Sequence, residues 1–512
     1  MTERVDIVIG SGPAGIAAAH GLLKRGRRVM MLDGGRDLEP GAENRRQTMA
    51  ATDPDGWEPA ARADWMKPQF TAGPGQIRRY GSDFAVEPAT AILCDPPSWF
   101  GLRASRARGG LSNLWGSAVL PYARSDLTGW PVRAEELAPH YRAVAEFLPI
   151  SGRADALEML FPDLPMTGRV PIQPAPQAAE LLRRAEDRTD ALAKHGVVIG
   201  MARQAVAPGC RLCGMCLHGC PYGLIWSGRH ALAQLQALPG FDYRPGDIVR
   251  SVAEDVDGAI VTLETGQELR GDRIFLAAGV LETARIVLRS QSGPGELTLR
   301  DSQHGFLPML HRWPNRTRPD RGRFHTLPQA FAELRAADMS PHLVHAQIYS
   351  WNEHFPRDLV DNYGRVPILV PLLRGLARRL MVAQIFLHSD HSHGMTLQLA
   401  PDGRLKVGLQ RNPETDAKLR AAARRLAKAF SALGLFSLPQ ALRIEPPGSS
   451  FHVGASLPMH HAPQAGQSDL LGRPHGWSRL HVVDASSLPA IPATTITLSV
   501  MANAHRIATN AP

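Results

Sequence analysis

Four cysteines lie within one short stretch of the chain, and their spacing is the clearest chemical signal in the sequence. The pattern C-x2-C-x2-C-x3-C, followed by a proline, is formed by Cys210, Cys213, Cys216 and Cys220. Thiolates this close together repel one another unless a metal neutralises them. Four of them on one tight loop, residues 209–223, suit a compact iron–sulfur cluster, whereas structural zinc usually joins two separated pairs of ligands. An iron–sulfur site is the first interpretation, with zinc or another metal second and free thiols third.

The elements that would position a second site lie at the amino terminus. Residues 5–9 (VDIVI) predict a short buried parallel strand, residues 16–24 predict a helix, and residues 28–32 predict a second strand that ends at Asp33. A strand, glycine turn, helix, strand and terminal acid in this order are typical of dinucleotide binding. A glycine turn in some other α/β protein is the alternative.

The turn between the first strand and the helix has the sequence GSGPAG. Gly10 permits the tight turn, Gly12 lets the backbone approach a pyrophosphate, and Gly15 lets the helix pack closely on the strand. The helix N-terminus offers free N–H groups to phosphates, and Asp33 is placed to accept hydrogen bonds from the ribose of the adenosine. The predicted cofactor-binding residues of this turn are Gly10, Gly12, Pro13, Ala14 and Gly15.

Later segments return to the same sheet, which favours FAD over NAD because large flavoproteins revisit their cofactor strand after several hundred residues. In chain order they are two alternating stretches that suit a small sheet (248–255 and 260–263), a strand that ends in Ala277-Ala278-Gly279 (272–276), a helix (281–290), a strand that ends at Asp484 (481–484) and a final helix (496–508).

These segments together resemble the glucose-methanol-choline (GMC) oxidoreductase family. The matching pieces, in the family's order, are GSGPAG, GGLSNLWG (109–116), AAG (277–279), FHVG (451–454) and VVDASSLP (482–489). The resemblance runs from residue 6 to about 508, with little recognisable signal over roughly 290 to 440. It implies FAD, hydride removal from a carbon that bears a hydroxyl, and an α/β fold: a Rossmann-like FAD-binding domain with a second α+β substrate-binding domain built on an antiparallel sheet.

The resemblance also implies domain boundaries and further cofactor contacts. The FAD-binding domain is expected over 1–40, 100–125, 195–295 and 465–512, and the substrate-binding domain over 126–194 and 296–464. The additional residues expected to contact FAD are Gly110, Asn113, Val249, Ala278, Gly279 and Asp484. Some family members attach FAD through a histidine just before the tryptophan of the glycine-rich segment; that position is Leu114 here, which excludes this attachment.

His452 matches the family's catalytic histidine through its FHVG context. A neutral imidazole is a suitable base for a hydroxyl proton near neutral pH. The second catalytic position is usually Asn or His, and counting back from the final helix places it at Thr495. Because a threonine hydroxyl is a poor base, either His452 is the sole base with Thr495 or Thr494 orienting the substrate, or the alignment is off by a residue or two.

The cysteine loop also resembles part of one GMC subgroup, the FAD-dependent sugar dehydrogenases that carry a three-iron cluster. Their C-x5-C-x3-C spacing is matched by Cys210, Cys216 and Cys220. Cys213 is an extra ligand candidate and would decide between [3Fe–4S] and [4Fe–4S]. A cluster passes electrons singly, so it would connect the flavin to an external acceptor, a protein or a quinone. That argues for a dehydrogenase over an oxygen-using oxidase.

The favoured function is dehydrogenation of a sugar or another alcohol, and three alternatives stay open. One is a lipid or lipid-linked alcohol as substrate, which the apolar residues 366–386 would serve; they predict an amphipathic helix packed on the core or, second, one lying on a membrane. The others are a non-redox flavin enzyme such as a lyase, and a redox-sensing module. A polar and aromatic pocket would favour sugars, and an aliphatic one lipids.

Composition limits the remaining classes. Lys and Arg total 57 against 48 for Asp and Glu, a scattered excess of +9 that argues against nucleic-acid binding. The apolar run 5–10 is too short for a secretory signal, and no run is long enough to predict a transmembrane helix. Crowded cysteines indicate a reducing compartment, so a cytoplasmic location, free or peripheral to the membrane, is expected. Cys94 stands alone and is expected to be a buried apolar residue.

Overall fold

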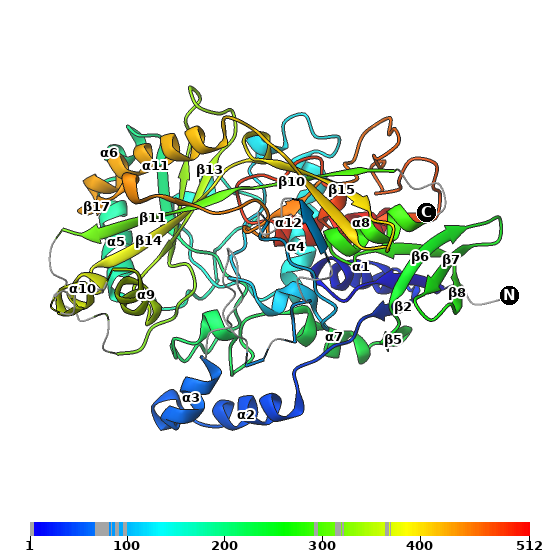
Figure 1. The fold of residues 1–512 in the computed structure, drawn as a ribbon, viewed down its shortest axis with the longest axis horizontal. Coiled ribbons are helices and arrows are strands. Elements are labelled where there is room, and N and C mark those ends of the chain that lie inside the picture. Colours follow the sequence, from blue (N-terminus) through cyan, green and yellow to red (C-terminus); the bar gives the residue numbers. More distant parts are fainter. Residues whose placement is uncertain are drawn as a thin grey trace.

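The computed structural model describes residues 5–66, 81–82, 84–87, 92–95, 100–290, 295–312, 319, 322–363, 368 and 370–512. The chain forms a parallel sheet with its helices at one end of the molecule and a large antiparallel sheet at the other (Figure 1). Among the described residues, no helix combines the length and the apolar character needed to cross a membrane.

The parallel sheet has the strand order β20-β9-β1-β2-β5. Its strands are β1 (Val5–Ile9), β2 (Arg28–Asp33), β5 (Phe241–Pro245), β9 (Arg273–Leu276) and β20 (Leu480–Val482). The first and the last of these in the chain lie on either side of β9, since Ile7 pairs with Ile274 and Ile274 pairs with Leu480. The predicted return of the chain to its first strand is thus present.

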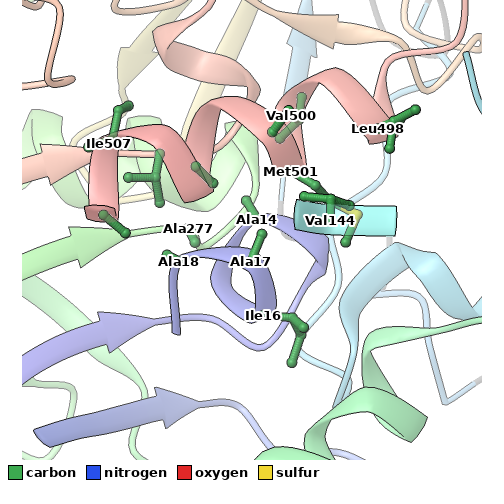
Figure 2. Packing of buried hydrophobic residues seen from close by; sticks show 14 of the residues in the cluster. Ala14, Ile16, Ala17, Ala18, Val144, Ala277, Leu498, Val500, Met501 and Ile507 are labelled. Atoms are coloured by element: carbon green, nitrogen blue, oxygen red, sulfur yellow. The ribbon is translucent and has the colours of Figure 1, made fainter. Parts of the chain in front are cut away.

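Two helices cover one face of this sheet and pack on each other. They are α1 (Pro13–Lys24) and α12 (Thr497–Asn510). Figure 2 shows Ala14, Ala17 and Ala18 of α1 facing the apolar side chains of α12. The small alanine side chains let the two backbones approach closely. A Cβ on Gly21 of α1 would lie only 3.2 Å from the Cβ of Ala508, which is a tight contact. The helix α4 (Ala134–Phe147) packs against α12 from another side.

A three-stranded sheet and a helix follow the cysteine loop, as the alternating stretches predict. The strands are β6 (Val249–Glu254), β7 (Ala259–Leu263) and β8 (Glu268–Gly271), and α8 (Val280–Arg289) follows β9. The glycine-rich segment that carries Gly110 forms the short 3-10 helix Gly110–Asn113, beside α7 (Gly228–Gln236).

The large antiparallel sheet has the order β17-β11-β14-β13-β12-β4, with β18 also paired to β11. Its strands are β4 (Val197–Met201), β11 (His304–His311), β12 (Ala330–Leu334), β13 (Val344–Tyr349), β14 (Leu380–Phe386), β17 (Leu435–Ser437) and β18 (Arg443–Ile444). One face is covered by α5 (Pro176–Asp187), α6 (Thr189–Ala193) and α11 (Thr415–Ala432) (Figure 1).

A second five-stranded sheet joins the two ends of the molecule. Its order is β19-β10-β15-β16-β3, and its strands are β3 (Ile92–Asp95), β10 (Leu297–Asp301), β15 (Gly394–Leu399), β16 (Leu405–Gln410) and β19 (Val453–Gly454). The lone cysteine Cys94 lies in β3 and is half-buried against the apolar core of this sheet, and burial raises the pKa of its thiol.

The structure differs from the sequence-based expectations in two places. The stretch 366–386 is not one helix: α10 (Val370–Ala377) ends before β14, whose residues alternate between buried and half-buried as in a strand. The predicted helix is therefore wrong beyond Ala377, because the strand pairs with β11 and β13 on both sides and tertiary pairing overrides helical spacing. The strand β4, in the stretch 195–295 assigned to the FAD-binding domain, pairs with β12 of the large antiparallel sheet.

Candidate active site

The glycine turn forms one end of a large cavity. A Cβ on Gly15 would lie 1.9 Å from the carbonyl oxygen of Gly10, and a Cβ on Gly10 would lie 2.4 Å from that of Ala277. Both glycines are therefore required by backbone packing. A Cβ on Gly12 would meet nothing within 4 Å, and Gly12 lines the cavity beside the N-terminus of α1. The free N–H groups of that helix end face space for an anionic group.

Asp33 ends β2 and lines the same cavity. One carboxylate oxygen accepts a hydrogen bond from the N–H of Ser11 at 2.7 Å, and the other accepts one from the N–H of Gly35 at 2.6 Å. Burial raises the pKa of Asp33, and these bonds oppose the rise. Oδ1 also accepts a long hydrogen bond from the hydroxyl of Tyr243 at 3.5 Å. A carboxylate only accepts hydrogen bonds, so Asp33 at the cavity wall suits hydroxyl donors such as those of a ribose.

The other predicted cofactor residues fall into two groups. Asp484 accepts hydrogen bonds from the N–H of Gly279 at 2.9 Å and the hydroxyl of Thr283 at 2.6 Å, which ties the ends of β9 and β20 together. The predicted residues that line the cavity are Gly10, Gly12, Pro13, Ala14, Asp33, Gly110, Asn113, Ala278, Gly279 and Asp484. Gly15 lies behind the turn, and Val249 packs in the core between the sheets, so neither lines the cavity.

Asn113 carries an unsatisfied atom at the cavity wall. Its amide nitrogen donates to the carbonyl oxygens of Arg108 at 3.0 Å and Gly110 at 2.8 Å. Its oxygen Oδ1 is buried, and no described residue donates to it. A buried acceptor without a donor is costly, so Oδ1 is placed to accept a hydrogen bond from a bound ligand.

His452 lines the same cavity. Its ring stacks on Phe386, with centroids 4.9 Å apart and planes 20° from parallel. Burial, and then the neighbouring His345 and His304, lower the pKa of His452 to about 3. The imidazole is thus neutral and can accept a proton. The preceding residue, Phe451, has a left-handed backbone (φ 61), a strained conformation of the kind that clusters at functional sites.

A second imidazole stands beside His452 and was not predicted from the sequence. His304 begins β11 and lines the cavity, and its ring stacks on the same Phe386 at 5.3 Å. Its Nδ1 is buried, and no described residue bonds to it; burial lowers the pKa of His304 to about 3. A lone histidine within a stretch of weak signal offered nothing to single it out among 20 histidines.

The two threonines considered for the second catalytic position differ in placement. Thr495 lines the cavity, and its hydroxyl oxygen accepts a hydrogen bond from the N–H of Leu120 at 2.7 Å. The hydroxyl hydrogen of Thr495 remains available to donate to a substrate oxygen. Thr494 is fully buried and does not line the cavity.

The cysteine loop touches the same cavity through one residue. Cys216 lines it, together with Leu217 and Gly219, whereas the other three cysteines of the loop do not. Burial raises the pKa of Cys216 to about 12, and it raises the pKa of Cys213 as well. The backbone N–H groups of Leu212 and Met215, two residues further on, oppose the rise in pKa at Cys210 and Cys213.

Donor atoms close enough for a single metal ion occur elsewhere. The described part of the chain contains one group of three potential ligand atoms that all lie within 4.8 Å of one another. They belong to His342, His388 and Asp390. The rings of the two histidines are stacked 3.6 Å apart and within 8° of parallel, so their in-plane lone pairs do not converge on one point. Asp390 is also paired with Arg300 at 2.8 Å. This cluster is better described as an ion-pair network than as a metal site.

The comparisons with known proteins bear on the fold. No family model and no curated protein matches the sequence. Among solved structures, pyridoxine 4-oxidase from Mesorbium loti matches over 99% of this chain and 98% of its own, with a TM-score of 0.58 and 15% sequence identity. The two chains share a fold. The predicted α/β architecture, a Rossmann-like parallel sheet with a second, antiparallel sheet, is thereby confirmed.

Proposed function

We propose that the protein binds FAD and oxidises a hydroxyl group of an organic substrate. The observation that carries this proposal is one continuous cavity of about 1470 Å³ that reaches from the glycine turn of α1 to His452. Pockets for a single small ligand are usually about 300–1,000 Å³. A cavity of this size, with a dinucleotide cradle at one end and a neutral base further along it, has room for a cofactor and a substrate.

The residues present fit FAD at the cradle. Gly12 leaves open space in front of the helix N-terminus. Asp33 is a carboxylate acceptor for ribose hydroxyls, and Oδ1 of Asn113 is a buried acceptor without a donor among the described residues. When bound, FAD would supply a two-electron acceptor for hydride.

The chain's own residues would manage the proton. His452 takes the hydroxyl proton of the substrate, because burial keeps its imidazole neutral and its ring faces the cavity. Thr495 donates its hydroxyl hydrogen to the same substrate oxygen and so orients it. The ring of Phe386 stacks on the imidazole of His452 and so holds the plane of that ring. These roles account for general-base catalysis by one positioned group.

Two spectra test this function. Purified protein should show the absorbance bands of an oxidised flavin, and acid or heat should release FAD. Alcohols mixed with it in the absence of oxygen should bleach those bands if one of them is a substrate. Protein that binds no flavin after incubation with FAD would contradict the proposal.

We further propose that the cysteine loop holds an iron–sulfur cluster that passes electrons from the flavin to an external acceptor. The spacing of the cysteines supports it, as do the backbone N–H groups near Cys210 and Cys213, since N–H groups commonly surround cluster thiolates. A single tetrahedral zinc holds its sulfurs about 3.8 Å apart. No three sulfurs of the described residues 209–223 come within 4.8 Å of one another. Wider spacing suits a cluster, in which each thiolate binds a different iron.

The position of Cys216 supports the proposed route for electrons. It is the cysteine of this loop that lines the cavity shared with the glycine turn. Iron and sulfide analysis of protein purified without oxygen tests the cluster directly. Protein that contains zinc in place of iron would exclude the iron–sulfur cluster. The proposed flavin chemistry would be unaffected by that result.

A further inference from the structure

The cavity wall beside His452 is formed by one face of the large antiparallel sheet. The strands β11 and β14 pair with His304 opposite Phe386 and Leu310 opposite Leu380. Every second residue of both strands lines the cavity, and the residues between them pack in the core under α11. The register therefore orders the lining residues in rows that lead away from the reactive end.

The two rows nearest His452 are polar or aromatic. The first row holds His304 and Phe386, and the second holds Phe306 of β11 and Gln384 of β14. The neighbouring strand β13 places Gln347 opposite Gln384.

A tyrosine orients the two amides of this band. The hydroxyl of Tyr349 lies 3.1 Å from Oε1 of Gln347 and 3.3 Å from Oε1 of Gln384. The hydroxyl carries one hydrogen and so donates to one of these oxygens at a time, which leaves the NH2 group of that amide as a donor for a hydroxyl or ether oxygen of a ligand.

The outer rows are aliphatic. The third row holds Pro308 opposite Val382, and the fourth holds Leu310 opposite Leu380. The first and fourth rows lie six residues apart along each strand, or about 20 Å. The lining on the facing side comes from α9 (His354–Tyr363) and α10 and includes Leu359, Leu373 and Leu376. Asp358 and Asp361 of α9 also line the cavity, and Asp361 pairs with Arg357 at 3.6 Å.

We propose that the substrate is an amphiphilic alcohol, with a hydroxylated head at His452 and an aliphatic tail along the outer rows. This inference rests on the proposed function and names its substrate class. A free sugar would leave the outer leucines exposed to water. A plain hydrocarbon alcohol would leave the amide donors beside Tyr349 without partners, so neither substrate matches the whole cavity wall. A head with several oxygens joined to an alkyl chain satisfies both halves.

A series of n-alkyl glucosides with methyl, butyl, hexyl and octyl tails tests the inference. Binding is measured from the perturbation of the flavin spectrum, and flavin reduction from anaerobic bleaching. Burial of each methylene along the outer rows should tighten binding about threefold to fourfold.

Two leucines on one helix provide a matched pair of variants. Leu376 lines the cavity, whereas Leu372 is 67% exposed on the same helix and does not. Leu376→Gln should abolish most of the dependence on tail length, and Leu372→Gln should keep it. If Leu376→Gln fails to fold, Val382→Thr makes the same test on the sheet side.

The outcomes separate this inference from the function on which it rests. Binding that is equally tight for methyl and octyl glucosides overturns the amphiphilic class, whether or not flavin is reduced. Binding that tightens with the tail in wild type and in Leu372→Gln but not in Leu376→Gln supports the class. If none of the series then bleaches the flavin, the fault lies with the proposed oxidation of this head and not with the tail site.

Discussion

His304 and His452 lie against the same phenyl ring, that of Phe386, although they come from distant parts of the chain. The N–H of Ser302, just before β11, donates to the carbonyl oxygen of His452 at 3.0 Å and holds the two segments together. Burial keeps both imidazoles neutral. The proposed reactive end of the cavity therefore offers two proton acceptors on one wall, where the sequence indicated one.

Replacing His452 tests which imidazole is the base. His452→Ala should slow anaerobic flavin reduction by about a thousandfold, because a positioned general base contributes about 10²–10⁴. His304→Gln should cost about tenfold and raise the KM for substrate, as expected for a group that positions the hydroxyl. Equal losses in the two variants would assign the base role to the pair, and a near-normal His452→Ala would remove it from His452.

The lowered pKa of His452 predicts an unusual dependence of the reaction rate on pH. A base works above its pKa and is lost as the pH falls through it, and burial lowers the pKa of His452 to about 3. The rate of flavin reduction should therefore stay level from pH 8 down to about 5. A tenfold loss per pH unit below about 6.5, the ordinary value for histidine, would show that this nitrogen is solvated in the working enzyme.

Two glycines of the turn should respond differently to substitution. A side chain at position 12 meets no protein atom within 4 Å, so Gly12→Val should fold with a melting temperature near that of wild type and lose its flavin. A side chain at position 15 would strike the carbonyl oxygen of Gly10, so Gly15→Val should lower the melting temperature sharply. Stoichiometric flavin in purified Gly12→Val protein would place the cofactor elsewhere.

Cys216 allows the proposed electron route to be tested apart from the flavin chemistry. Cys216→Ser should leave substrate-driven bleaching of the flavin intact and abolish transfer to a one-electron acceptor such as ferricyanide. Cys94→Ser is the control, since Cys94 lies in β3 within another sheet. A Cys216→Ser protein that reduces the acceptor at the full rate would exclude the loop as the route.

The charge on His342 should make stability depend on pH in the alkaline range. Asp126 and Asp390 raise the pKa of His342 to about 9, and the ring stacks on His388. A raised pKa stabilises the fold fully below the unfolded value of about 6.5, and this stabilisation is lost as the pH rises through 9. Since Asp390 is partly exposed, the contribution is on the order of 1–2 kcal/mol.

Denaturant unfolding of wild type and His342→Gln at several pH values checks this. The difference in free energy of unfolding should be largest at pH 6 and should nearly vanish by pH 10. A difference that grows toward pH 10 would have the wrong sign for ion pairing.

The parts of the site that could be predicted are those encoded locally. The turn from Gly10 to Gly15 and the acid at Asp33 follow from spacing within one strand–helix–strand unit, and the structure brings them together as expected. The place of His304 in the site could not be predicted, because it depends on contact with the ring that also packs on His452, far along the chain. Likewise, residues 380–386 follow a helix after only two arginines whose spacing suits that helix, and only their pairing with β11 and β13 makes them a strand.

The parallel sheet is complete only when its last strand has been synthesised. β1 and β2 are made first, yet β20, which completes one edge, ends at Val482, and α12 follows to cover Ala14 and Ala17. At translation rates of about 5–20 residues per second, the interval is roughly 25 to 95 seconds. During that time the nascent chain must carry an unfinished, apolar amino-terminal unit. Folding of this protein on the ribosome should therefore depend on chaperones that shield its first strands.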